Sequence, residues 1–203
     1  MMKKRLILIV LMLLAALLLT GCAKEEEKTA SLYVNVIDTF VFDESREALE
    51  KELTDALPAL NTTEAPLSVV AISSGDTEKD PMGAMAGMTQ IAGLMATGEM
   101  ELILADTENA RRHGDNGGSY IPLDELFTKE EQTALGIVPL CIPVSNDDGE
   151  FTGEMSIPCG IDLSGCVRLT EMLHSTDVGA YVLVSSKHVD NAKTVIQHLL
   201  TMK

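Results

Sequence analysis

The residue with the clearest chemistry is Cys22, whose thiol follows directly after a short apolar segment. Lys3, Lys4 and Arg5 give the chain a basic start, and residues 6–19 are all apolar. A helix that crosses a bilayer needs about 20 apolar residues, so this run is too short and has the length of a signal-peptide core. Because a thiolate is a strong nucleophile, Cys22 is a suitable acceptor for an alkylating lipid.

The tetrapeptide at residues 19–22, Leu-Thr-Gly-Cys, resembles the bacterial lipobox. The resemblance implies that Cys22 receives a diacylglycerol, that residues 1–21 are a signal peptide, and that Cys22 becomes the mature N-terminus. Two or more acyl chains would hold the protein stably at the extracytoplasmic face of the cell membrane. The alternative is an uncleaved signal anchor in which Cys22 plays no part.

The charge of the chain excludes two classes of partner. The sequence has 15 Lys and Arg residues against 31 Asp and Glu residues. Removal of Lys3, Lys4 and Arg5 with the leader leaves 12 basic residues, so the mature chain has a net charge of −19. Such a surface repels nucleic acid and anionic lipid headgroups. We therefore expect no nucleic-acid partner, and we expect the lipid on Cys22 to supply the membrane attachment.

The motifs of common catalytic sites are missing. The sequence has no G-x-S-x-G, Walker, G-x-G-x-x-G or H-E-x-x-H pattern, and none of His113, His174, His188 and His198 has another His at i+3 or i+4. We predict no enzymatic activity, no resident metal and no cofactor. An unrecognised hydrolase stays open, because any two acidic side chains of the fold could meet as a catalytic pair.

Three cysteines follow Cys22 in the mature chain: Cys141, Cys159 and Cys166. An odd number leaves at least one thiol free, which argues against a disulfide scaffold. A Cys141–Cys159 disulfide stays open and would need a longer turn than the tight one that the sequence suggests.

The first half of the domain alternates predicted strands and helices. Residues 22–30 are expected to be a disordered acidic tether, and residues 31–203 a single α/β domain. The predicted order is strand 32–37, helix 44–57 with Asp43 as its N-cap, strand 67–72, helix 82–97 ended by Gly98, and strand 100–105. This β-α-β-α-β order favours a parallel or mixed sheet with helices on both faces.

The second half is less regular. We expect a helical stretch over 122–135, an irregular edge hairpin from 136–144 and 155–163 with its turn near Gly149, a helix over 167–173, a strand over 180–185 and a final helix capped by Asp190. Arg111, Arg112 and His113 are interpreted as cations in the last turn of a short helix, and a carboxylate-binding spot is the alternative.

Three stretches resemble the extracytoplasmic solute-binding lipoproteins of ABC transporters, the periplasmic type 2 binding proteins. They are residues 96–106 (ATGEMELILAD), 120–126 (YIPLDEL) and 181–200. The resemblance implies a binding-protein-like fold, capture of a small solute and an ABC permease as partner. That family has two lobes, whereas this chain has the length of about one. The missing lobe would fall at residues 127–161.

A reduced fold of this kind leaves two functions open. The protein either presents a solute to a permease, or it is a docking lipoprotein that binds another membrane or surface protein. Ligands of open parallel sheets bind at the carboxyl ends of the strands. The candidate ligand-binding residues at these ends are Asp38, Thr39, Ser73, Ser74, Asp76, Asp106, Thr107 and Glu108. They would suit a cationic or polar solute or a metal ion, and the alternative is that they are turn and cap residues.

Overall fold

The computed structural model describes residues 30–146 and 148–203. The predicted signal peptide, Cys22 and residues 23–29 of the tether lie outside this part of the chain. Within it, no helix combines the length and the apolarity needed to cross a bilayer.

The first half of the chain forms the predicted β-α-β-α-β unit. Its elements are β1 (Leu32–Asp38), α2 (Asp43–Ala56), β2 (Leu67–Ser73), α3 (Pro81–Thr97) and β3 (Leu102–Ala105). Strand β1 lies between β2 and β3 and runs parallel to both. Buried apolar runs and helical periodicity are local signals, so this half is confirmed with only small shifts of its boundaries.

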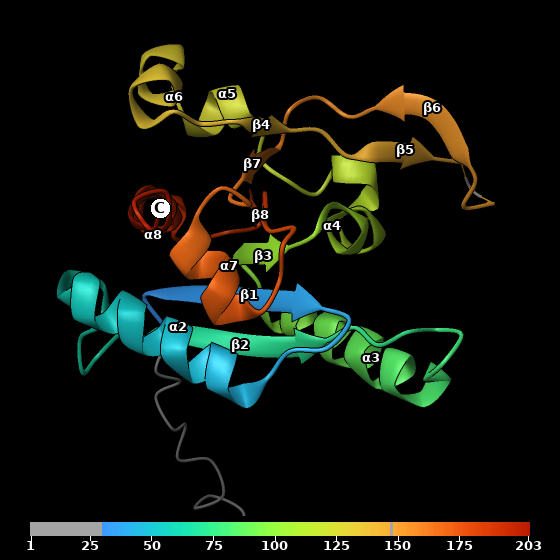
Figure 1. Ribbon diagram of the computed structural model, residues 1–203, viewed down its shortest axis with the longest axis horizontal. Coiled ribbons are helices and arrows are strands. Elements are labelled where there is room, and N and C mark those ends of the chain that lie inside the picture. The colour runs from blue at the N-terminus through green and yellow to red at the C-terminus, as the bar shows by residue number, and fades with distance from the viewer. Residues whose placement is uncertain (1–29, 147) are drawn as a thin grey trace, which may run out of the picture.

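The second half adds three antiparallel strands to the same sheet. These are β4 (Pro139–Leu140), β7 (Gly160–Asp162) and β8 (Gly179–Val182). Strand β8 runs antiparallel to β3, and the full order is β2-β1-β3-β8-β7-β4. The predicted hairpin is therefore only partly right. Its outer part forms a separate ribbon, β5 (Pro143–Ser145) with β6 (Phe151–Met155), which extends away from the sheet (Figure 1).

Helices cover both faces of the sheet, as expected. One face packs against α2, α7 (Val167–Leu173) and α8 (Val189–Leu199), and the other against α3 and α4 (Thr107–His113). The predicted helical stretch 122–135 divides into α5 (Leu123–Leu126) and α6 (Lys129–Leu135), because Thr128 and Glu131 form a capping box between them. Short 3₁₀ turns occupy Pro58–Leu60 and Asp115–Gly117.

Two predicted helix caps are wrong. The N-cap of α2 is Phe42 and that of α8 is His188, and neither side chain caps its helix. Asp43 and Asp190 lie one position or more further on, in the first turn, where a carboxylate still interacts favourably with the helix dipole. The predicted end of α3 is confirmed, since Gly98 has a left-handed backbone with φ of 75°.

Candidate functional site

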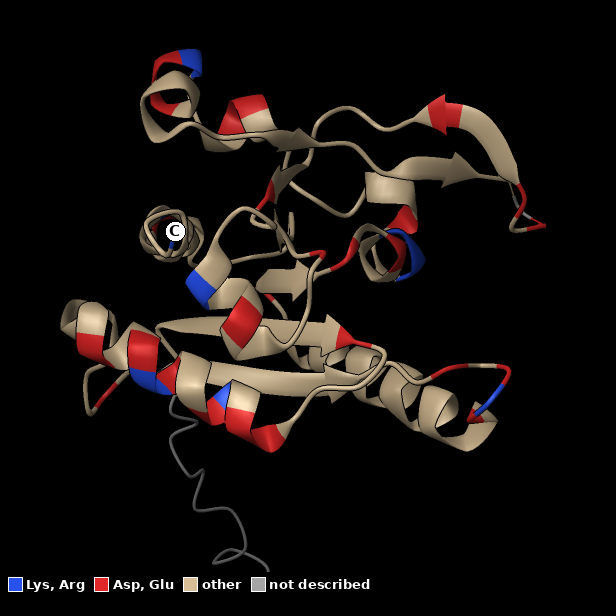
Figure 2. Ribbon diagram, viewed as in Figure 1, with Lys and Arg blue, Asp and Glu red and all other residues tan. Residues whose placement is uncertain are grey.

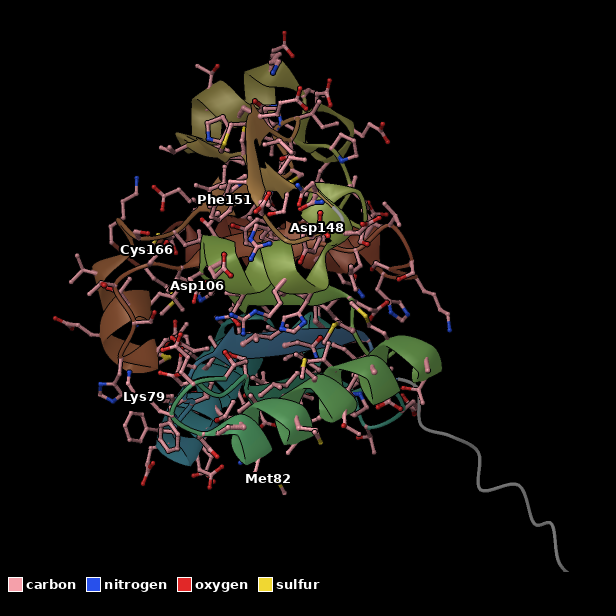
Figure 3. The ribbon with its side chains drawn as sticks, turned by 90° about the vertical axis from the view of Figure 1, so that its right-hand side faces the viewer. Lys79, Met82, Asp106, Asp148, Phe151 and Cys166 are labelled. Atoms are coloured by element: carbon pink, nitrogen blue, oxygen red, sulfur yellow. The ribbon has the colours of Figure 1, made fainter. Side chains whose placement is uncertain are left out.

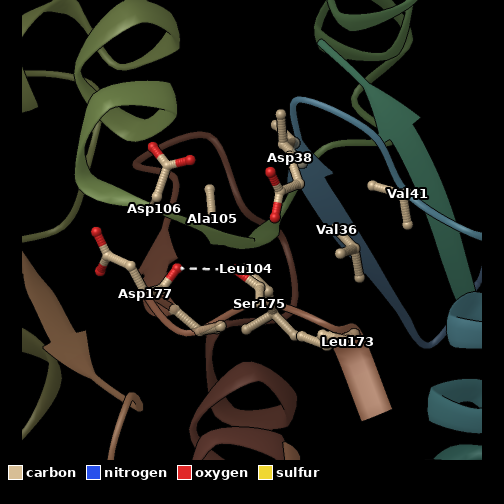
Figure 4. Close-up of a pocket in the computed structure, with 11 residues that line it drawn as sticks. Val36, Asp38, Val41, Leu104, Ala105, Asp106, Leu173, Ser175 and Asp177 are labelled. Carbon is tan, nitrogen blue, oxygen red and sulfur yellow. Dashed lines mark hydrogen bonds between the residues drawn. The ribbon is translucent and has the colours of Figure 1, made fainter. Parts of the chain in front are cut away.

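Two of the predicted residues meet at the carboxyl edge of the sheet. Asp38 ends β1, and Asp106 lies between β3 and α4 (Figure 3). Because β1 and β3 are parallel neighbours, both carboxylates reach the same depression, whose floor is formed by side chains such as Val36 and Leu104 (Figure 4). The free space in the depression is about 10 Å³, which is roughly the room for one water molecule.

Asp177 is a third carboxylate at this depression, and the sequence interpretation missed it. Since β8 runs antiparallel to β3, the segment that precedes β8 arrives at the carboxyl edge rather than the amino edge. The Ser175 hydroxyl donates to the Asp177 carbonyl oxygen over 3.4 Å within this segment (Figure 4). Partial burial raises the pKa of Asp177, and the negative charges of Asp106, Asp162 and Asp38 raise it further.

The predicted serines hold the turn after β1. Ser74 donates to the Asp38 carbonyl oxygen from its backbone N–H, over 2.7 Å, and from its hydroxyl, over 3.0 Å. The Ser73 hydroxyl accepts the backbone N–H of Val41 over 3.0 Å. Thr39 is exposed, and its N–H donates to the Asp38 carboxylate over 2.6 Å. These residues thus make the local turn contacts that the turn-residue alternative describes.

The remaining predicted residues also serve local structure. Asp76 binds the Lys79 ammonium over 2.9 Å and accepts two backbone N–H groups, and the Lys79 hydrogen bond is the main reason that the pKa of Asp76 falls to about 2. Asp106 caps α4 by accepting the N–H of Asn109 over 2.7 Å. Thr107 is the half-buried first residue of α4, and Glu108 is exposed.

The two Arg side chains of the positive spot on α4 share one carboxylate, that of Glu108. The Arg111 guanidinium forms two hydrogen bonds with Glu108, of 2.6 and 2.8 Å, which lower the pKa of that carboxyl group. Its remaining nitrogen donates to the Ser145 hydroxyl over 3.1 Å, and the group lies 5.2 Å from the centre of the Phe151 ring. The interpretation of these cations as a last-turn cluster is confirmed, and Arg111 also joins α4 to the β5–β6 ribbon.

Exposed aromatic residues flank Val41, which lines the acidic depression. The rings of Phe40 and Phe42 meet edge to face at 4.9 Å, and Phe42 meets the His174 ring at 5.4 Å. Phe40 is 63% exposed and Phe42 is 46% exposed. The chain has only four Phe residues, so two of them on one exposed turn indicate a contact surface. The sequence interpretation gave neither Phe a role.

A second depression lies on a different side of the sheet, between α5–α6 and β4. It is lined by residues that include Asp124, Lys129 and Ile157, and its free space is about 200 Å³. Small-molecule pockets usually measure about 300–1,000 Å³. Neither this depression nor the acidic one reaches that size, whereas an open depression lined by residues that include Thr170 and Ser175 measures about 420 Å³. In the described part of the chain, no three His, Cys, Asp or Glu side chains are placed to hold a metal ion.

The described thiols do not form a nucleophilic site. Cys141, Cys159 and Cys166 are all free, so the possible Cys141–Cys159 disulfide is not formed. Burial raises the pKa of Cys159 and of Cys166, which keeps both thiols protonated and weakly nucleophilic.

Comparison with known proteins finds no matching family model, no matching curated protein and no matching solved structure.

Proposed function

We propose that the protein is a lipid-anchored docking protein of the extracytoplasmic face, and that the carboxyl edge of its sheet binds a cationic segment of another membrane or surface protein. The observation that carries this proposal is the arrangement of residues 127–161. They add β4 and β7 to the one main sheet and form the β5–β6 ribbon. A fold that encloses a solute between two lobes would need a second sheet here.

The chemistry of the carboxyl edge supports a cationic partner. Asp38, Asp106 and Asp177 border one depression, and no Lys or Arg in the described part of the chain lies within salt-bridge distance of any of them. The adjoining rings of Phe40 and Phe42 offer π faces that attract an ammonium or guanidinium group. A basic segment with a Lys or Arg side chain would therefore find both a carboxylate and an aromatic contact.

The size of the depression supports a macromolecular partner over a free solute. Its free space admits about one water molecule, so a ligand must lie on the edge and not inside it. A ligand held on one side only gains enough contact when it is part of a larger surface. The lipid on Cys22 would hold the docking surface close to partners in the same membrane.

A photocrosslinking pair tests the proposal in native membranes. A photoreactive residue replaces Phe40 in one variant and Phe151 in the other; Phe151 is the matched control, since it is 64% exposed and lies on β6. We expect the Phe40 variant to form a discrete adduct with a basic segment of a membrane or surface protein. The adduct should disappear when Asp38 and Asp177 are both changed to Asn. Equal labelling from both positions, or an adduct that survives the Asn changes, would overturn the proposal.

Solute capture is tested separately by thermal unfolding of the full chain. A ligand at ~100 times its Kd stabilises a protein by about 2.7 kcal/mol. Stabilisation of that size by a free amine, an amino acid, a short peptide or a divalent ion would favour the solute-presenting function over the docking function.

A further inference from the structure

One edge of the main sheet is open along most of its length, although at its start the outward N–H of Leu67 donates to the Asn61 side chain over 3.3 Å. Strand β2 pairs with β1 over all seven of its residues, and among the described residues no strand pairs with its other side. Its sequence, Leu-Ser-Val-Val-Ala-Ile-Ser, has no charge, no Pro and no bulge. The opposite edge strand β4 is only two residues long and contains Pro139. Short length and Pro are the features that normally prevent edge-to-edge pairing.

Helix α3 places an uncharged surface beside this open edge. None of its 17 residues is Asp, Glu, Lys or Arg, and within it only Ala84, Gly87 and Ile91 are buried. In Figure 2 charged segments appear along α2, α4 and α6 but not along α3. Met82 and Met85, on its outward face, are 76% and 60% exposed. Flexible thioether side chains are suited to an adaptable protein contact.

Helix and strand form one rigid unit. A Cβ atom on Gly87 would lie 2.3 Å from the Ser73 carbonyl oxygen, and one on Gly75 would lie 2.4 Å from the Ala84 nitrogen. The helix therefore approaches the carboxyl end of β2 at backbone distance. A partner that pairs with β2 would meet the surface of α3 in a fixed position.

We propose that β2 and the outward face of α3 form a self-association surface for a second copy of this chain. Antiparallel pairing of β2 with β2 of the second copy, about a two-fold axis, continues the sheet and places the two α3 helices on the same face. The partner must supply an open strand edge and an uncharged helix, and this chain has both. A charged partner would leave its charges unpaired against α3.

The absence of charge on α3 favours contact between copies at this surface. Two chains that each carry a net charge of −16 repel one another, and neither β2 nor α3 adds a charged side chain to that repulsion. Helix α2 flanks β2 on the other face and has six acidic against two basic side chains. The two α2 helices would face each other across the interface. Salt should therefore strengthen the association by screening the repulsion between their acidic side chains.

The dimensions indicate a weak dimer. A seven-residue strand and a 17-residue helix are each about 25 Å long. With a helix diameter of about 10 Å added to the strand edge, each copy would bury roughly 500 Å², which is near the lower limit for a specific interface. We therefore expect association when the protein is concentrated on a membrane.

Cysteine crosslinking of the full chain in phosphatidylcholine vesicles tests this inference. Thr89 lies on the exposed face of α3, and Thr133, exposed on α6, is the matched control. In a Cys141→Ser background, a short bismaleimide should give at least tenfold more dimer adduct with Thr89→Cys than with Thr133→Cys. Added salt should increase the yield of the Thr89→Cys adduct. Adding Met85→Glu to the Thr89→Cys variant should remove the adduct, whereas adding Thr133→Glu to it should leave the yield unchanged.

Hydrogen exchange provides an independent readout of strand pairing. We expect the β2 amides that face away from β1 to exchange more slowly at high than at low protein density in the vesicles. Equal crosslinking at Thr89 and Thr133, or density-independent exchange in β2, would overturn the inference. So would protection of the Thr89→Cys thiol from a water-soluble maleimide without dimer formation, which would identify lipid as the occupant.

Discussion

The buried carboxylate of Glu101 provides the sharpest test of how this fold is held together. Its side chain is 1% exposed and lies just before β3. One oxygen accepts the backbone N–H of Tyr33 over 3.1 Å, and the other accepts that of Lys187 over 2.9 Å. The His188 Nδ1 atom lies 3.0 Å from both oxygens. One carboxylate thus joins the start of β1 to the turn that leads into α8, and Glu101→Gln changes its charge with little change of shape.

The expected cost of Glu101→Gln follows from these partners. A Gln amide presents one oxygen and one NH₂ group, whereas Tyr33 and Lys187 both need an acceptor. One buried N–H is therefore left unpaired, which costs about 1–3 kcal/mol, and the surviving hydrogen bonds lose the contribution of a charged acceptor. We expect a destabilisation of about 3 kcal/mol, a large part of the ~5–15 kcal/mol that stabilises a typical domain.

Urea unfolding followed by circular dichroism measures this cost. With an m-value of about 2 kcal/mol per molar urea, the midpoint of Glu101→Gln should fall by about 1.5 M at unchanged m. The control is Glu108→Gln, which removes a carboxylate that is 51% exposed and paired with Arg111. Its cost should stay below about 1 kcal/mol. If the two variants unfold at the same urea concentration, the Glu101 hydrogen bonds do not stabilise the fold as reasoned.

Two further outcomes test the packing and the electrostatics. Gly160→Ala should destabilise the protein by about 1–3 kcal/mol in the same assay, because its new Cβ would lie 2.3 Å from the Tyr181 ring. The control is Gly165→Ala, which should leave stability unchanged because its Cβ would meet no atom within 4 Å. The pKa of Asp177 in the folded protein is raised above its usual 3.8. The free energy of unfolding should therefore fall as the pH rises from about 3.8 through the raised pKa. Asp177→Asn should remove this loss, and at a pH below 3 it should match the unchanged chain.

The parallel half of the fold was predictable because its signals are local. Residues 67–72 are apolar except for Ser68 and include β-branched residues, which is typical of a strand. The end of α3 at Gly98 follows from a residue that adopts a left-handed backbone without strain. These features depend on a few consecutive residues, so the sequence pattern is sufficient.

The antiparallel half was not predictable in the same way. The direction of β8 depends on the end of β3 at which the preceding chain arrives, and its apolar residues would suit either direction. The role of Glu101 also depends on distant residues, since Tyr33 and Lys187 reach it only after the sheet has formed. The predicted hairpin divided because β7 gains hydrogen bonds to β8 and burial in the main sheet, which an isolated β4–β7 pair would lack.

The direction of β8 also decides what the carboxyl edge can bind. An open parallel sheet has a crevice where neighbouring crossovers leave in opposite directions. Here the segment before β8, with Ser175 and Asp177, lies across that position and lines the depression together with Val36 and Leu104. The segment before β8 therefore adds a third carboxylate and leaves about 10 Å³ of free space at that position. What is left is a charged, aromatic outer surface, and a basic segment of a partner protein can reach such a surface without entering the fold.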